Sequence, residues 1–333
     1  MRNGIAVAGN MVMDISYPIG GFPKPGELTT ILDGISYSTG GALCNVIMSL
    51  AHLDRNIPLF AIGRVGTDTE GDMVLEKLNA FSNIDSTSVK REGITSFTAV
   101  MADTVTKQRT FFHYRGANAS FNLEDIDFSR INAKIFHIGY ILLLHTLDSP
   151  DPVYGTKMAQ LLHHAQESGL KTSIDVVSEA GDRFKRLVPP ALKYTDYCII
   201  NEVEAQASTG IMLRSDTGKL ITENIPAALK SLISQGVSTW AVIHCPEGGS
   251  GMDADGSFVS VNSLKLPDGF IKGTVGAGDA FAAGVLYGAH EGISLKGSIE
   301  YGTASAACSL SQFGATEGVL SIDKAMELYR KLR

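Results

Sequence analysis

A glycine turn followed by a carboxylate is the clearest chemical feature of this 333-residue chain. Gly276, Ala277 and Gly278 precede Asp279, and small and apolar residues continue to position 288. Glycine lets successive backbone N–H groups approach one point, and the N-terminus of a following helix attracts anions. Because a carboxylate repels phosphate, Asp279 fits better as a base that takes a proton from a hydroxyl. The amides would then hold the charge that develops on a transferred phosphoryl group.

Asp279 also fits a simpler role, because an acidic residue in the first turn of a helix caps that helix and complements its dipole. The helix that follows favours the catalytic role. Ala280, Gly284 and Gly288 recur at every fourth position, which places small residues on one helix face. We therefore expect a closely packed, buried helix whose N-terminus is held rigidly.

Three segments resemble signatures of the ribokinase-like carbohydrate kinases, the PfkB family. Residues 273–288 resemble the C-terminal signature, residues 40–45 the first signature, and residues 61–71 the strand–loop–helix that follows it. The three occur in the order and spacing of the family. The resemblance implies an α/β fold: a doubly wound, mostly parallel sheet with helices on both faces and a small β-lid. It also implies that Asp279 is the catalytic base and that the turn before it forms the anion hole.

Strand-like and helix-like segments alternate along the chain, which independently indicates a largely parallel sheet covered on both faces. The expected strands are Ile5–Gly9, Ile57–Gly63, Lys134–Gly139, Lys171–Val176, Asp196–Ile200 and Thr239–His244. The expected helices are Ala42–Leu53, Gly71–Phe81, Val153–Ser168, Ile225–Ser234, Asp279–His290, Leu295–Ser309 and Asp323–Leu332.

Two regions interrupt this alternation and are expected to form the lid, over about 12–37 and 96–117. Within the second region, Ser96–Asp103 and Arg109–Tyr114 alternate with period two, as a pair of strands does. No repeat or linker divides the sequence, so a single domain over 1–333 is expected. The relatives often pair through their lid, so the resemblance implies a homodimer.

The resemblance assigns the substrate to residues near the first strand and the lid. Asp14 would accept hydrogen bonds from sugar hydroxyls. Gly40 and Gly41 would let the sugar lie against the backbone, and the Asn45 amide can donate and accept at once. Arg115 would reach into the cleft to bind oxygens of the substrate or the γ-phosphate. Asp14 and Asn45 could instead cap local turns, and Arg115 could be a solvated strand residue.

The nucleotide and its metal are assigned to the other half of the chain. Asn201 and Glu204 resemble the family's Asn-x-x-Glu motif, which suits Mg²⁺ held through water. They could instead form an ordinary acidic helix N-terminus. The nucleotide-binding residues are then expected to be Asn201, His244, Gly249 and Gly278.

Several positions depart from the family pattern. Gly273 and Val275 stand where relatives often have Asp and Thr, so the usual monovalent-cation site is doubtful. The ammonium of Lys272 could fill the vacated space, or backbone carbonyls alone could hold the ion. Pro246 replaces a glycine of the nucleotide loop. Asp175 keeps the first residue of an Asp-x-Asn-x-Arg pattern whose other two positions are Val177 and Glu179.

Composition excludes several classes of function. A net charge of −7 without a basic run argues against nucleic acid or an anionic membrane as partner. No signal peptide or membrane span is indicated, and four scattered cysteines suggest reduced thiols, so a cytoplasmic protein is expected. Walker, dinucleotide-binding, nucleophile-elbow and zinc-protease motifs are all missing from the sequence.

These observations predict an ATP-dependent kinase that phosphorylates a hydroxyl of a non-phosphorylated sugar or sugar-like alcohol, with Mg²⁺ as cofactor. A phosphorylated sugar is disfavoured because relatives with such substrates tend to carry a Lys where this chain has Ala42 and Leu43. Two alternatives stay open: a nucleoside kinase of the same fold, and a catalytically silent relative that binds a sugar or a nucleotide.

Overall fold

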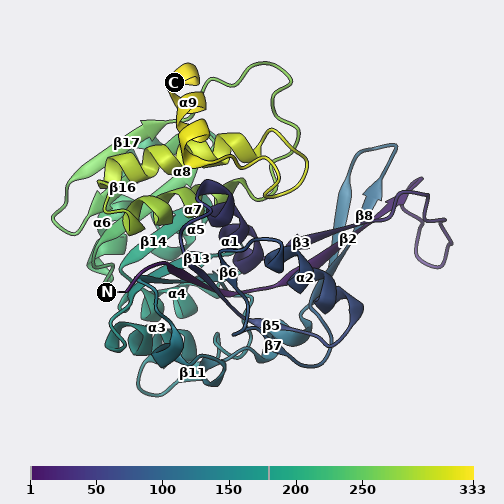
Figure 1. Cartoon of the computed structure of the whole chain (residues 1–333). Coiled ribbons are helices and arrows are strands. Elements are labelled where there is room, and N and C mark those ends of the chain that lie inside the picture. The colour runs from purple at the N-terminus through teal and green to yellow at the C-terminus, as the bar shows by residue number, and fades with distance from the viewer. Residues whose placement is uncertain (1, 179–180) are drawn as a thin grey trace.

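The computed structural model describes residues 2–178 and 181–333. Position 179, which departs from the family's Asp-x-Asn-x-Arg pattern, lies outside the described residues. A large central sheet runs through the molecule in the order β17-β16-β15-β14-β13-β10-β1-β4-β6 (Figure 1). The pairs from β15 to β6 are parallel, and β16 and β17 add an antiparallel edge. Its strands are β1 (Ile5–Gly9), β4 (Leu59–Ile62), β6 (Ile84–Asp85), β10 (Ile135–Ile141), β13 (Lys171–Val176), β14 (Tyr197–Asn201), β15 (Trp240–Cys245), β16 (Gly248–Asp253) and β17 (Phe258–Asn262).

Helices cover both faces of this sheet, as predicted. Alternate strand residues point to opposite faces, so Ile5 and Val7 join one buried cluster while Ala6 and Ala8 join the other. The first cluster is completed by α1, α2, α7, α8 and α9, and the second by α3, α4, α5 and α6. Their bounds are α1 (Ala42–Leu53), α2 (Thr69–Asn79), α3 (Lys157–Glu167), α4 (Phe184–Leu192), α5 (Glu202–Thr209), α6 (Ile225–Ser234), α7 (Ala277–His290), α8 (Leu295–Ser309) and α9 (Ile322–Leu332).

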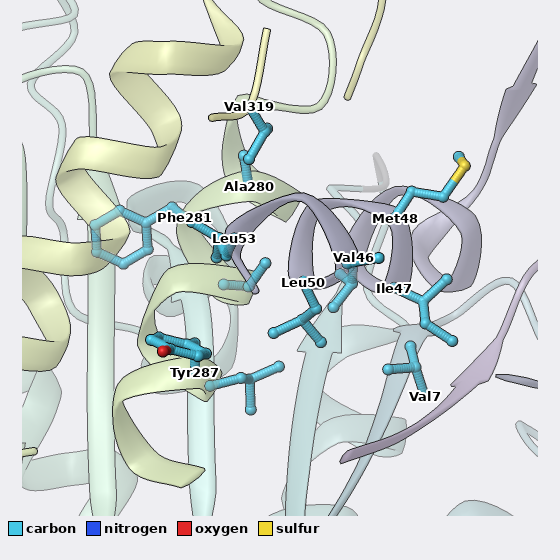
Figure 2. Packing of buried hydrophobic residues seen from close by; sticks show 14 of the residues in the cluster. Val7, Val46, Ile47, Met48, Leu50, Leu53, Ala280, Phe281, Tyr287 and Val319 are labelled. Atoms are coloured by element: carbon cyan, nitrogen blue, oxygen red, sulfur yellow. The ribbon is translucent and has the colours of Figure 1, made fainter. Parts of the chain in front are cut away.

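The helix after the glycine turn is buried along nearly its whole length, as its small-residue stripe predicted. A Cβ at Gly284 would lie 2.6 Å from the backbone of Gly302 in α8, and one at Gly288 would lie 2.4 Å from Ser298 Oγ. On its other side α7 packs against α1, and Figure 2 shows side chains of α1 such as Ile47 lying over Val7 of the sheet. This packing fixes the N-terminus of α7.

A second, four-stranded sheet extends away from the main body at the right of Figure 1. Its order is β3-β2-β8-β9, and the expected strand pair of the second lid region is the antiparallel pair β8–β9. β2 pairs with β3 in the antiparallel sense and with β8 in the parallel sense, so the two predicted lid regions form one sheet. The strands are β2 (Val12–Ile19), β3 (Ser36–Gly40), β8 (Phe97–Asp103) and β9 (Arg109–Tyr114).

The predicted helix Val153–Ser168 was wrong at its start. Two short strands, β11 (Pro150–Asp151) and β12 (Gly155–Thr156), precede α3, because the Asp151 carboxylate accepts hydrogen bonds from the N–H groups of Val153 and Tyr154 and closes a turn. The Thr156 hydroxyl then caps α3 by accepting from the Ala159 N–H at 3.1 Å. A further small pair, β5 (Arg64–Val65) and β7 (Lys90–Arg91), was not predicted either.

Among the described residues, no helix combines the length and the hydropathy that crossing a bilayer requires.

Candidate active site

Asp279 lies in the first turn of α7, and its side chain is fixed by two donors from distant parts of the chain. Asn45 Nδ2 of α1 donates to Asp279 Oδ2 at 2.9 Å. The Tyr140 hydroxyl, near the end of β10, lies 2.8 Å from Oδ1 and 3.1 Å from Oδ2. The sequence predicted Asn45 and Asp279 for one site, and the structure brings them into direct contact. Asp279 is only 5% exposed.

The glycine turn adopts the geometry that an anion site needs. Gly276 caps α7 with a φ of 76°, and a Cβ there would lie 2.6 Å from the Ala315 side chain, so only glycine fits without a shift. Within the described chain, the N–H groups of Gly276 and Gly278 make no hydrogen bond, whereas that of Ala277 makes a long one of 3.4 Å to the Thr274 carbonyl. These amides are available at the positive end of the helix dipole.

Burial and hydrogen bonding act in opposite directions on the Asp279 carboxyl. Burial raises its pKa to about 6, although the donors Asn45 and Tyr140 favour the ionised form and lower it. A carboxyl group with a pKa near neutrality suits general base catalysis, because it is ionised at pH 7 and still a useful proton acceptor.

Two further carboxyl groups face Asp279 across a cavity of about 270 Å³. Asp175 lies at the end of β13, and Glu204 lies in the first turn of α5. Burial, with the charge of Glu204 next, raises the pKa of Asp175 well above its usual range. Burial also raises the pKa of Glu204 to about 7, against the donors Asn201 and Ser178. No Lys or Arg of the described residues lines this cavity, so three carboxyl groups gather there without a basic side chain, and their oxygens suit a divalent cation.

Asn201 and Glu204 lie together as expected, and they also form the capping box of α5. Asn201 Oδ1 accepts from the Glu204 N–H at 2.9 Å, and Glu204 Oε2 accepts from the Asn201 N–H at 2.9 Å. Glu204 Oε1 accepts in addition from the Asn201 amide and the Ser178 hydroxyl. In the described part of the chain no three acidic, His or Cys side chains are close enough to hold a metal directly. The donor set therefore fits a hydrated Mg²⁺ rather than a direct protein cage.

A larger cavity of about 640 Å³ adjoins the first, because Asn201, His244 and Gly278 line both. Its size and apolar lining match an organic ligand such as a nucleoside. The His244 ring lies 4.9 Å from the Phe281 ring, and burial lowers the pKa of His244 to about 4, so the imidazole is neutral. The remaining wall is largely aliphatic and includes Leu264, Leu266, Ile271, Ala306, Ala307 and Leu310.

Gly249 was predicted to bind the nucleotide, but it does not line this cavity. A Cβ at Gly249 would lie 2.7 Å from Phe281 and 2.8 Å from Ile299, so the residue packs onto the core. Its neighbour Gly248 lines the cavity, as does Pro246.

The predicted substrate residues Asp14, Gly40 and Gly41 lie where the second sheet joins α1. A Cβ on Gly40 would lie 2.3 Å from Asp14 Oδ2, so the carboxylate rests against the Gly40 backbone. Gly41 has a φ of 85°, and a Cβ there would lie 2.4 Å from the Asn10 carbonyl oxygen. Burial raises the pKa of Asp14, with the Thr98 hydroxyl opposing it. The buried Asn45 Oδ1 has no hydrogen-bond partner among the described residues, which leaves it available to a ligand.

Two predicted side chains lie apart from these groups. Arg115 is exposed and lines neither cavity. Lys272 is also exposed, and its backbone N–H donates to the Leu310 carbonyl at 2.8 Å. The exposure of Lys272 favours the alternative in which only carbonyl groups are available near Gly273. The carbonyl oxygens of Gln312 and Phe313 would each lie 3.1 Å from a Cβ at Gly273.

Tyr140 and Asp175 were missed as site residues by the sequence reasoning. Each lies at or near the end of a parallel strand, β10 or β13, where open α/β sheets bind their ligands. That position was the available signal. Tyr140 directly follows the predicted strand Lys134–Gly139, and it is the one aromatic residue among positions 140–144.

Comparisons with known proteins agree with this geometry. Residues 2–322 match the pfkB family carbohydrate kinases. Adenosine kinase of Schizosaccharomyces pombe is 26% identical over 283 residues, covering 80% of this chain and 78% of that protein. Deoxyribokinase of Salmonella typhi is 26% identical over 278 residues, covering 83% of this chain and 82% of that protein.

Solved structures show the same fold. Ribokinase of Arabidopsis thaliana, complexed with ribose and ATP, superposes with a TM-score of 0.79 at 20% identity, covering 99% of both chains. Ribokinase of Thermotoga maritima superposes with a TM-score of 0.77 at 20% identity, again over 99% of both chains. The fold, the buried carboxylate behind its glycine turn and the match over residues 2–322 establish that this chain belongs to the pfkB family of carbohydrate kinases.

Proposed function

We propose that this kinase transfers the γ-phosphoryl group of ATP to a hydroxyl of a non-phosphorylated sugar or sugar-like alcohol. The observation that carries the proposal is Asp279, buried and doubly hydrogen-bonded at the N-terminus of α7, at a cavity that adjoins a nucleoside-sized pocket. The carboxylate takes the proton of the acceptor hydroxyl. The acceptor oxygen then bonds to the γ-phosphorus as the bond to ADP breaks.

The amides of Gly276, Ala277 and Gly278 would hold the charge that develops on the transferred group. Asn201 and Glu204 would hold Mg²⁺ through water, and a bound Mg²⁺ would neutralise phosphate charge. Asn201, His244 and Gly278 would contact the nucleotide, since they line both cavities. Asp14, Gly40, Gly41 and Asn45 would hold the acceptor, with Arg115 closing over it.

An uncharged acceptor is supported by the charge of the site. None of the described Lys and Arg residues lines either cavity. An acceptor that already carries a phosphate would therefore lie near Asp175, Glu204 and Asp279, and the cation proposed to approach it is the exposed Arg115. The adenosine kinase relative keeps a nucleoside acceptor as the second candidate.

The test is a coupled assay of ADP formation, followed by ³¹P NMR of the product. The panel contains D-ribose, 2-deoxy-D-ribose, adenosine and, as a phosphorylated acceptor, D-fructose 6-phosphate, each with and without Mg²⁺. Turnover of a free sugar supports the proposal, and turnover of adenosine alone supports the nucleoside alternative. Preference for the sugar phosphate would contradict it, and no turnover with a broadened panel of sugars and alcohols would identify a silent relative.

We also propose that the chain forms a homodimer through its second sheet. Phe112 and Tyr114 of β9 are exposed and lie on the same face of the second sheet, because alternate strand residues share a face. Exposed aromatic surface of this kind is typical of interfaces. Sedimentation equilibrium should give twice the chain mass. The Phe112→Asp variant should give the mass of one chain, whereas a monomeric wild-type protein would contradict this proposal.

A further inference from the structure

Tyr140 is placed beside Asp279 by two hydrogen bonds between its own strand and Asn10. Its backbone N–H donates to Asn10 Oδ1 at 3.1 Å, and the Asn10 N–H donates to the Gly139 carbonyl at 3.2 Å. Asn10 directly follows β1, and β1 pairs in parallel with β10. The backbone that carries the phenol is therefore fixed by the central sheet, and the phenol reaches Asp279 across the small cavity that both residues line.

The two donors to Asp279 leave room for a substrate hydroxyl. A carboxylate oxygen accepts about two hydrogen bonds. Oδ2 receives Asn45 and the longer contact from Tyr140, while Oδ1 receives only the shorter contact from Tyr140. One acceptor position on Oδ1 is therefore unused by the described residues. Without Tyr140 the carboxyl group would be held only through Asn45.

The charges around Asp279 show why a second donor matters. Asp175 of β13 and Glu204 of α5 line the same cavity, and burial raises the pKa of both carboxyl groups, while the imidazole of His244 in β15 is neutral. On the α1 side the facing residue is the uncharged Asn45. Burial opposes ionisation of Asp279, and the hydrogen bonds from Asn45 and Tyr140 favour it. The neutral hydroxyl of Tyr140 stabilises the carboxylate without adding a charge that would bind a phosphate group.

We propose that Tyr140 is a positioning residue, whose hydroxyl orients the Asp279 carboxylate and keeps it ionised for proton transfer. This role rests on the proposed function of Asp279 as the base. Tyr140 itself remains a donor throughout the working range, because burial and the Asp279 charge raise the pKa of Tyr140 well above its usual value.

The test compares wild type with Tyr140→Phe, which keeps the ring and removes the hydroxyl. Aspartate labelled with ¹³C at its carboxyl carbon allows Asp279 to be titrated by NMR in the substrate-free protein, with its signal assigned from Asp279→Asn. We expect the pKa of Asp279 to rise by about one unit or more in Tyr140→Phe, since hydrogen bonds to charged groups are the strong ones. With the best acceptor of the panel, kcat at pH 6.5 should fall about 10–100-fold, and both KM values should change less than about threefold. The acid limb of the pH profile should move to higher pH.

Tyr154→Phe is the matched control, because the Tyr154 ring lies 5.8 Å from the Tyr194 ring and 5.0 Å from the His163 ring, and Tyr154 lines neither cavity. It should behave as wild type. A folded Tyr140→Phe protein with an unchanged Asp279 titration and unchanged kcat would overturn the positioning role while Asp279→Asn remained inactive. Full activity of Asp279→Asn would instead overturn the proposed function, so the two failures are distinguishable.

Discussion

Two regions of the site differ in how far they are assembled without a ligand: the base end, formed by Asp279, Asn45 and Tyr140, and the second sheet. At the base end, Asn45 and Tyr140 each donate a hydrogen bond to Asp279, and the three side chains are largely enclosed by α1, α7 and the central sheet. In the second sheet, every residue of β9 is exposed, as are three of the five residues of β3. In the proposed reaction charge develops at the base end during phosphoryl transfer, and donors that are already in place need no reorganisation at that moment. We expect the second sheet to cover the substrate, and such a cover can form when the substrate arrives.

The largest expected effect tests the base end. Asp279→Asn preserves the shape of the side chain and removes its capacity to take a proton, so kcat should fall about 10²–10⁴-fold with little change in nucleotide affinity. Steady-state kinetics and a nucleotide-binding titration measure the two quantities. Retention of more than about a tenth of the wild-type kcat would show that the proton goes elsewhere.

Asp14 tests the contribution of the second sheet. Asp14→Asn weakens hydrogen bonds to acceptor hydroxyls, so the KM for the acceptor should rise roughly 10–100-fold while the KM for ATP stays within about twofold. The matched control is Asp33→Asn, since Asp33 is an exposed acidic residue between β2 and β3. Equal effects of the two substitutions would remove Asp14 from the acceptor site.

The pH dependence of activity tests the base end through the protonation of Asp279. The pKa of Asp279 is raised to about 6 in the folded protein, and only the ionised carboxylate is a base. Activity should therefore be full above pH 7 and fall as pH decreases through about 6, reaching roughly a tenth of the plateau at pH 5. Profiles of kcat/KM measure this. A midpoint near pH 4 would mean that Asp279 titrates as an ordinary aspartate, although Asp175 and Glu204 contribute to the observed value.

Much of the fold followed from local patterns. The strand-like runs Ile5–Gly9 and Lys171–Val176 and the helical patterns of Ala42–Leu53 and Leu295–Ser309 predicted β1, β13, α1 and α8 with their observed bounds. Helix α4 was missed because Pro189 and Pro190 argue against a helix interior. It forms because its buried positions recur at helical spacing and pack on the sheet; these are Phe184, Leu187, Val188, Ala191 and Leu192.

Spacing alone brings site residues together only within one motif: Asp279 is contiguous with its turn, and Asn201 with Glu204 spans one helical turn. Asn45 was placed in the same site as Asp279 by the family resemblance. Tyr140 meets Asp279 because the sheet places the end of β10, beside β1, next to the N-terminus of α7. That adjacency depends on the strand order, which no local pattern specifies.

Hydrogen exchange measures the second sheet and the base end in a single experiment. Addition of a saturating acceptor should slow exchange several-fold in residues 12–37 and 96–114, because a covered sheet excludes water. Exchange in the β10 segment that carries Tyr140 should change little, since it is already bonded within the central sheet. Unchanged exchange in the second sheet would show that it does not cover the substrate.

The smallest effect is expected from monovalent cations. Gly273 and Val275 offer no side-chain oxygen, and the nearby oxygens are the carbonyls of Gln312 and Phe313, each 3.1 Å from the position of a Cβ on Gly273. A cation held only by neutral carbonyls in an open loop gains little over its hydration shell, so occupancy should have little influence on the anion hole. Replacing K⁺ by tetramethylammonium at constant ionic strength should change kcat less than about twofold. In a matched test, Gly273→Asp restores a carboxylate beside these carbonyls and should introduce a measurable K⁺ dependence. Several-fold activation of the wild-type enzyme by K⁺ would show that the carbonyl groups alone suffice, and that this loop is as preorganised as the base end.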